Sequence, residues 1–239
     1  MEETVIAMSA RDTILASIRA SLGVTGQEAP RRKIVADRLS AHPAGVVPRR
    51  GQLPAPERAE LFARMVEAAA GTLASVASAE DVPSAVAAFL RRHNLPPSVQ
   101  RGGDDLLAAL PWQREPSLEV AVGPSDGRQL ASVSHAFGAV AETGTLVLTA
   151  GPDNPATLNF LPDNHIVVVE AKDIAGDFET VLARLRDRFG DSLPRVVNMI
   201  TGPSRSADIE QTLILGAHGP RRLHVIVVGE GAGPATGTG

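Results

Sequence analysis

Short apolar runs in the second half of the chain constrain the fold more than any other feature of the sequence. The run Ile166-Val-Val-Val169 is apolar at every position. It therefore suits a strand that is covered on both faces, as in the centre of a parallel sheet. Comparable runs at 145–149, 196–200 and 224–228 are accompanied by helical periodicity, which is clearest over 178–189. Strands that alternate with helices predict a mostly parallel, three-layer α/β domain.

The amino-acid composition argues against several classes of protein. Of the 239 residues, 44% are hydrophobic but only 3% are aromatic, which predicts a core of Val, Leu, Ile and Ala. So few rings argue against a base-stacking surface for single-stranded nucleic acid. The net charge of −4 supplies no basic field for DNA or RNA. Because the chain has no cysteine, it can form no disulfide, thiolate nucleophile or cysteine-ligated iron–sulfur cluster of its own.

Localisation follows from the distribution of apolar residues. No apolar run approaches the roughly 20 residues that a membrane-spanning helix needs. The N-terminal residues include Glu2, Glu3, Arg11 and Asp12 and lack the apolar centre of a signal peptide. These features predict a cytoplasmic protein without a membrane span.

The N-terminal part differs in pattern from the rest. Ser9 and Gly23 are placed to cap a helix over 10–22. Residues 24–57 lose periodicity and are interrupted by prolines, which predicts an extended arm or linker. The arginines of this arm fit either a docking surface for an acidic partner or a solvated linker.

Three segments follow from this division: an N-terminal helix with a Pro- and Arg-rich arm (1–57), an α/β domain (58–229) and a flexible Gly-rich tail (230–239). Within the α/β domain, periodicity and turn residues predict additional elements. These are helices over 57–76 and 83–92, a strand over 118–122, a turn over 123–127, a short helix from Ser134 to Val140, and a helix that begins near Ile209.

The stretch from Val196 to Gln211 carries the best-defined candidate site. An apolar strand ends at Thr201 and Gly202, and a small polar loop precedes the predicted helix. A strand, a tight turn and a helix start form a corner that suits anions, because free backbone N–H groups and the helix dipole meet there. Ser204 and Ser206 add hydroxyl donors, and Arg205 can grip a carboxylate or phosphate with two hydrogen bonds. Asp208 and Glu210 fit either helix capping or chemistry.

Three further positions are candidates. Glu142, in Glu142-Thr-Gly-Thr145, is either a base, nucleophile or hydrogen-bond acceptor at a ligand, or an exposed residue at a turn. His165, at a strand entrance, is either an acid, base or ligand-binding group or a structural residue. His218, between glycines on the turn Gly216-Ala-His-Gly-Pro220, is either a ligand contact or a helper of a helix end. No second His lies at metal-binding spacing, and neither a P-loop nor a Gly-x-Gly-x-x-Gly fingerprint is present.

Four segments, taken in order, resemble the LUD (lactate utilisation) domain family over roughly residues 115–229. They are Ala141-Glu-Thr-Gly-Thr-Leu-Val-Leu148, Leu161-Pro-Asp-Asn-His-Ile166, Thr201-Gly-Pro-Ser-Arg-Ser-Ala-Asp-Ile-Glu210 and Gly216-Ala-His-Gly-Pro220. The chain length and the absence of cysteines are similar to the C-type branch of that family. The resemblance implies a fold like the NagB/RpiA/CoA-transferase group.

The matching residues, read together with the local patterns, define one hypothesis about a site. It states that a single pocket binds a small carboxylate, and no catalytic residue is assigned. The candidate ligand-binding residues are Glu142, Thr143, Gly144, Thr145, His165, Thr201, Gly202, Ser204, Arg205, Ser206, Asp208, Glu210 and His218.

The resemblance also implies a function. It implies a part in the oxidation of L-lactate to pyruvate, as a non-iron–sulfur subunit or accessory. No cofactor is expected in this chain, and A-type and B-type partner proteins are expected to carry the iron–sulfur clusters. Two alternatives remain. One is a free-standing isomerase or CoA-transferase, with Glu142 as base or nucleophile and the Thr201–Ser206 loop holding phosphate or CoA. The other is a sensor of a small acid.

Overall fold

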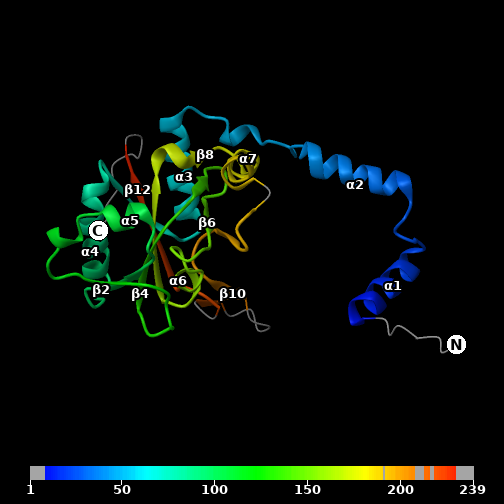
Figure 1. Cartoon of the computed structure of the whole chain (residues 1–239). Helices are drawn as coiled ribbons and strands as arrows, with labels where there is room; N and C mark the ends of the chain where they lie inside the picture. Colours follow the sequence, from blue (N-terminus) through cyan, green and yellow to red (C-terminus); the bar gives the residue numbers. More distant parts are fainter. Residues whose placement is uncertain (1–8, 191, 208–212, 216–217, 230–239) are drawn as a thin grey trace. The chain divides into compact units, whose positions relative to one another are not determined.

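The computed structural model describes residues 9–190, 192–207, 213–215 and 218–229 (Figure 1). Internal contacts divide the chain into two compact units, Met1–Val46 and Val47–Gly239.

Two helices lie in the described part of the first unit. Helix α1 (Ala10–Leu22) is capped as predicted, because Ser9 Oγ accepts the Asp12 N–H at 3.2 Å and Gly23 has a φ of 62°. The prediction of an extended arm is wrong for its first part, since Ala29–Ala41 form helix α2. Pro30 lies in the first turn of α2, where a missing N–H costs no hydrogen bond, and the remaining prolines of the arm lie beyond the helix.

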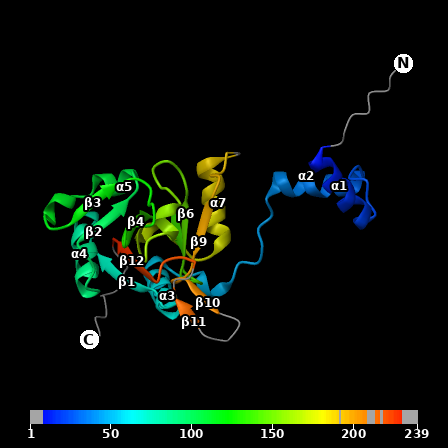
Figure 2. The same ribbon diagram turned by 90° about the horizontal axis from the view of Figure 1, so that it is seen from below.

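The second unit is built on a six-stranded sheet in which every neighbouring pair is parallel (Figure 2). Its strands, in spatial order, are β1 (Thr72–Val76), β12 (Arg222–Val228), β7 (Asn164–Glu170), β4 (Ala131–His135), β2 (Ser98–Arg101) and β3 (Glu119–Val122). The run Ile166–Val169 lies in β7, between β12 and β4. The predicted central parallel position is therefore confirmed.

Successive residues of β7 face two separate cores. Ile166 and Val168 pack on one face, together with α4 (Val82–Arg92) and α5 (Asp105–Ala109). Val167 and Val169 pack on the opposite face, together with α3 (Ala55–Ala68). Because all four β7 side chains are fully buried, an uninterrupted apolar run is what this position requires.

A second, four-stranded sheet covers part of the face that α3 occupies. Its strands, in spatial order, are β8 (Ile174–Ala175), β5 (Gly138–Val140), β6 (Thr145–Thr149) and β9 (Val197–Ile200). β6 is antiparallel to both β5 and β9. Helix α7 (Phe178–Phe189) packs on this sheet through Val181 and Leu185. The predicted strands 145–149 and 196–200 therefore exist, but they belong to this sheet and not to the parallel one.

The remaining elements are short. The α-helical turn α6 spans Thr157–Phe160. Four 3₁₀ turns are η1 (Arg49–Gly51), η2 (Ala79–Asp81), η3 (Trp112–Arg114) and η4 (Ala171–Asp173). A small antiparallel hairpin pairs β10 (Arg205–Ala207) with β11 (Leu213–Leu215).

Two predicted helices are wrong, and a third, predicted over 57–76, ends at Ala68 because Thr72–Val76 form β1. The segment from Ser134 to Val140 holds the end of β4 and all of β5. Ser134 is a buried strand residue whose hydroxyl bonds to Asn159, and it caps no helix. Leu213 lies in β11, so the helix predicted from Ile209 does not include it. Strand pairing overrides the local helical pattern in both places, since β4 pairs with β7 and β11 pairs with β10 in a hairpin.

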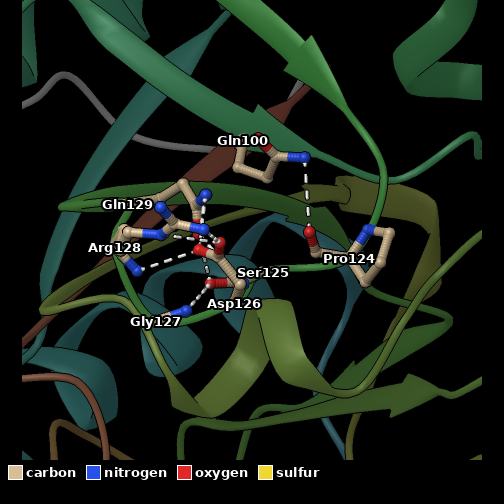
Figure 3. A network of polar contacts seen from close by, with 7 residues as sticks. All are labelled: Gln100, Pro124, Ser125, Asp126, Gly127, Arg128 and Gln129. Carbon is tan, nitrogen blue, oxygen red and sulfur yellow. Dashed lines mark hydrogen bonds and ion pairs between the residues drawn. The ribbon is translucent and has the colours of Figure 1, made fainter.

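The predicted turn between β3 and β4 is present and is held by side chains (Figure 3). Gln129 Oε1 accepts the Ser125 hydroxyl at 2.7 Å and the Asp126 N–H at 3.2 Å. Gln100, in β2, donates from Nε2 to the Gly123 carbonyl at 3.1 Å. The turn is thereby tied to the sheet, and the architecture confirms a mostly parallel α/β domain preceded by helices.

One prediction concerns the N-terminus of α7. Asp177 caps this helix by accepting the Thr180 N–H at 2.8 Å, and it also accepts Gln52 Nε2 at 2.8 Å. Replacing Asp177 with alanine is expected to lower the free energy of unfolding by about 1–2 kcal/mol, since a buried cap is lost. Urea unfolding checks this. Asp187→Ala, which removes an exposed acid from the same helix, is the control, and an equal loss in both variants would contradict the capping role.

Candidate functional site

A cavity of about 260 Å³ lies at the amino ends of β7 and β12. Its wall is apolar with a few polar groups, which is the usual composition of a small-molecule site. The lining residues are Asn159, Phe160, His165, Met199, Ile200, Thr201, Gly202, Pro203, Ser204, His218, Gly219, Pro220 and Leu223.

Three buried polar residues form a network at this cavity. His165 Nε2 lies 3.0 Å from Ser134 Oγ, and Ser134 Oγ donates to Asn159 Oδ1 at 3.0 Å. His165 and Asn159 line the cavity, and both are almost completely buried. Within the part of the chain that the structure describes, His165 Nδ1 and Asn159 Nδ2 have no hydrogen-bond partner. Buried polar atoms without partners mark places where a water or ligand atom is needed.

The imidazole of His165 is a neutral group. Desolvation by burial lowers its pKa to about 3, because a charged ring would have to exist away from water. His165 therefore acts as a hydrogen-bonding group near neutral pH, and a general-acid role is not supported there.

Two serines of β4 position α6 at the cavity. Ser132 Oγ donates to the Leu158 carbonyl at 2.6 Å, and Ser134 holds the Asn159 side chain. Ser132, Ser134 and Asn159 are absent from the candidates drawn from sequence. Two serines at alternate positions of one strand, Ser132 and Ser134, are a signal that could have identified this polar face.

The loop after β9 forms another part of the wall. Thr201, Gly202 and Ser204 all line the cavity, and the Ser204 N–H donates to the Pro220 carbonyl at 2.8 Å. Gly202 has a φ of 69°, and a side chain there would collide with the Ala69 carbonyl. The loop leads into strand β10 at Arg205. The helix start predicted at Asp208 and Glu210, on which the anion site depended, lies outside the described residues.

A chain of threonines connects the turn after β5 to this loop. Thr145 Oγ1 lies 2.7 Å from Thr143 Oγ1 and 2.7 Å from Thr201 Oγ1. Gly144, with a φ of 68°, packs against the backbone of Met65 and Val66 in α3. The turn is thus fixed to both α3 and the cavity rim.

Glu142 and Arg205 are not among the lining residues of this cavity. Glu142 is buried, with Oε2 at 3.7 Å from Arg50 Nε, which is a distance for an ion pair and not for a hydrogen bond. Arg205 is exposed and donates from Nη2 to the Ala69 carbonyl at 3.3 Å, beyond the C-terminal end of α3. A guanidinium is favourable beside the unpaired carbonyls of a helix end.

The structure thus separates the sequence candidates into groups. The cavity gathers His165, Thr201, Gly202, Ser204 and His218. Thr143 and Thr145 are connected to Thr201 of the cavity through hydrogen bonds, whereas Glu142, Gly144 and Arg205 are not among its lining residues. Ser206 is part of β10, and Asp208 and Glu210 lie outside the described residues.

The described residues contain no group of three or more His, Asp or Glu side chains arranged to hold a metal ion. Within those same ranges, no helix combines the length and the apolarity that crossing a bilayer requires.

The fold agrees with a sequence comparison that defines the class of protein. The family model described as LUD domain matches residues 59–228, so this chain belongs to the LUD domain family. A crystal structure of a DUF162 family protein from Deinococcus radiodurans has the same fold, with a TM-score of 0.55 and 24% identity. The match covers 74% of this chain and 99% of that one.

Among curated relatives, several carry the name Lactate utilization protein C. The protein of that name from Geobacillus thermodenitrificans is 36% identical over 43% of this chain and 45% of its own length. The one from Exiguobacterium sp. is 36% identical over 48% of this chain and 49% of its own length. The one from Geobacillus kaustophilus is 34% identical over 49% of this chain and 53% of its own length. The chain thus spans about half the length of the relatives it matches.

Proposed function

We propose that this protein is a component of an L-lactate utilisation system, which oxidises lactate to pyruvate in the cytoplasm. The observation that carries the proposal is the similarity, at 34–36% identity, to three relatives named for lactate utilisation. Membership of the LUD domain family supports the same assignment.

The size of the cavity favours a ligand of a few heavy atoms. Its volume of about 260 Å³ lies slightly below the roughly 300–1,000 Å³ typical of small-molecule sites. A three-carbon acid fits such a space, whereas an acyl-CoA does not fit inside it. The described lining also presents hydroxyl, amide and imidazole groups that suit a small polar ligand.

Electron transfer is assigned to partner proteins in this proposal. Oxidation of lactate releases two electrons, and the chain has no cysteine with which to bind an iron–sulfur cluster through thiolates. We therefore assign the clusters to A-type and B-type partners and the role of a non-iron–sulfur subunit to this chain.

The alternative of a free-standing isomerase or CoA-transferase needs Glu142 and Arg205 to act together on one ligand. These two residues contact Arg50 and the Ala69 carbonyl, respectively, and neither lines the cavity. If the chain is instead a sensor of a small acid, the acid would bind in the same cavity. The sensor role differs from the subunit role because no turnover is expected with any partner.

A purification from lactate-grown cells tests the proposal. The tagged chain is expected to bring down iron–sulfur proteins, and the eluate is expected to reduce a dye when L-lactate is added, whereas the isolated chain does not. A chain recovered alone and without lactate-dependent activity would contradict the subunit role.

A further inference from the structure

One edge of the six-stranded sheet is open among the residues that the structure describes. Strand β1 comes first in spatial order, and within the described ranges it pairs with β12 alone (Figure 2). Its sequence, Thr72-Leu-Ala-Ser-Val76, contains no charged residue and no proline. Native proteins commonly protect edge strands with such residues. Strand β1 is therefore suited to pair with a further strand.

The backbone groups available for this pairing belong to Leu73 and Ser75. The Val76 carbonyl accepts the Gly229 N–H at 3.0 Å, on the side of β12. Because the N–H and C=O groups of successive residues point to alternate sides of a strand, those of Leu73 and Ser75 point away from β12. No described residue forms a hydrogen bond to them.

Helix α4 lies beside β1 and extends this edge. A cavity of about 270 Å³ separates them, and its wall includes Thr72 and Ala74 of the strand and Ala85 and Arg92 of the helix. The helix face that borders the cavity starts at Asp81, because positions 81, 85, 88 and 92 recur at helical spacing. Both Asp81 and Arg92 are exposed. An acid and a base thus lie at opposite ends of one helix face.

A second copy of this chain is complementary to this edge. If β1 pairs antiparallel with its own copy about a two-fold axis at Ala74, Leu73 of each copy lies opposite Ser75 of the other. These two residue pairs then exchange four backbone hydrogen bonds. The two α4 helices also run antiparallel, so Asp81 of each copy lies on the side of Arg92 of the other. Opposite charges therefore meet at both ends of the interface.

The charge pattern favours a second copy over an unrelated strand. Any extended segment can satisfy the backbone groups of an edge strand. An antiparallel copy of α4, in addition, places a base beside each acid. The side chain of Val76 faces the α4 side of the sheet. In this register it lies opposite Thr72 of the other copy, where it adds apolar contact at the cavity.

We propose that the edge formed by β1 and α4 is an interface between two copies of this chain, through which their parallel sheets join into one continuous sheet. Leu73 and Ser75 supply the backbone hydrogen bonds, and Asp81 and Arg92 set the antiparallel orientation. The interface is independent of the cavity at the amino ends of β7 and β12, because that cavity is lined by other residues.

Analytical ultracentrifugation of the full chain tests the interface, and a concentration-dependent dimer is expected. Ser75→Pro removes an N–H that points away from β12, which an edge strand tolerates. The substitution removes two of the four bonds between copies, so the dissociation constant of the dimer is expected to rise at least about ten-fold. Val122→Pro is the matched control, because it alters the opposite edge strand, β3, and no change is expected. The Val122 N–H also points away from the neighbouring strand, since the Gly123 N–H donates to the Arg101 carbonyl at 2.8 Å.

Two charge variants test the orientation of the copies. Arg92→Asp and Asp81→Arg are each expected to weaken self-association, because like charges then meet at both ends of the interface. Mixed in equal amounts, the two variants are expected to form a heterodimer, since each acid again meets a base. Circular dichroism checks that both variants fold, because Asp81 also accepts the Ser78 hydroxyl at 3.1 Å.

Three results would overturn the interface. The first is a chain that stays monomeric at all concentrations. The second is a dimer that Ser75→Pro weakens no more than Val122→Pro does. The third is a mixture of the two charge variants that associates no better than either variant alone. None of these measurements involves lactate or a partner protein, so the interface and the proposed function can fail separately.

Discussion

Gly144→Ala is expected to lower the free energy of unfolding by about 3 kcal/mol or more. Gly144 has a φ of 68°, where a side chain on an L-residue is strained. An added Cβ would also lie 2.6 Å from the Met65 carbonyl carbon and 2.6 Å from the Val66 nitrogen. These are backbone atoms of helix α3, so relief requires the turn or the helix to move. Urea unfolding followed by circular dichroism gives the loss directly.

Gly127→Ala is the matched control for this prediction. Gly127 has a φ of 88°, but no atom lies within 4 Å of the position its Cβ would take. The control therefore carries backbone strain without a collision, and about 1–2 kcal/mol is expected. If the two variants lose equal stability, the close approach of the Gly144 turn to α3 contributes nothing.

Acidification is expected to destabilise the second unit well before its carboxylates are protonated. Burial lowers the pKa of His165 to about 3 and that of His224 to about 4, against 6.5 for a free histidine. Because both folded values lie below the unfolded value, the unfolded state binds more protons as pH falls. The associated stability is complete above about pH 6.5 and is lost as pH falls toward the folded pKa values. Each histidine accounts for about 2 kcal/mol between about pH 8 and pH 5.

The surroundings of His224 explain why protonation of its imidazole is unfavourable. Its ring stacks on Phe89 at a centroid distance of 4.6 Å, and its Nδ1 lies 2.8 Å from Thr72 Oγ1. Desolvation is the main cause of the low pKa, and the charges of His93 and Arg92 add to it. A cation formed at His224 would therefore be both buried and repelled.

Unfolding free energies at several pH values measure the effect. His165→Gln and His224→Gln are each expected to remove about half of the pH dependence. NMR titration of the histidine rings is an independent check if a variant does not fold. A stability that is flat between about pH 8 and pH 5 would refute the assignment.

The sequence predicted those elements whose pattern is local. The cap residues of α1 stand next to its ends, and the apolar residues of α7 recur at helical spacing. The fully apolar run of β7 indicated burial on both faces of the sheet. The sequence also indicated a polar loop after β9, and the structure shows that Thr201, Gly202 and Ser204 of this loop line a cavity. These features depend on neighbours within a few residues, so they are visible without the fold.

The candidate site could be predicted only in part from such local patterns. His165 and His218 lie 53 positions apart in the chain, and they meet at the cavity because β7 and β12 are adjacent strands. Ser134 resembled a helix cap because serine favours both situations. Its actual role depends on α6 and β7, which lie 25 and 31 residues further along the chain.

The sequence by itself determined that this chain forms layers of helices on a parallel sheet with an aliphatic core. Burial of continuous Val and Ile runs allows few other arrangements. The tertiary structure alone decided that β6 and β9 form a separate antiparallel sheet and that Arg205 enters a hairpin. It also decided that Glu142 and Arg205 lie outside the cavity that holds His165. Strand partners and cavity walls are chosen by contacts between distant segments, and the free energy of those contacts is not encoded in any short stretch of the chain.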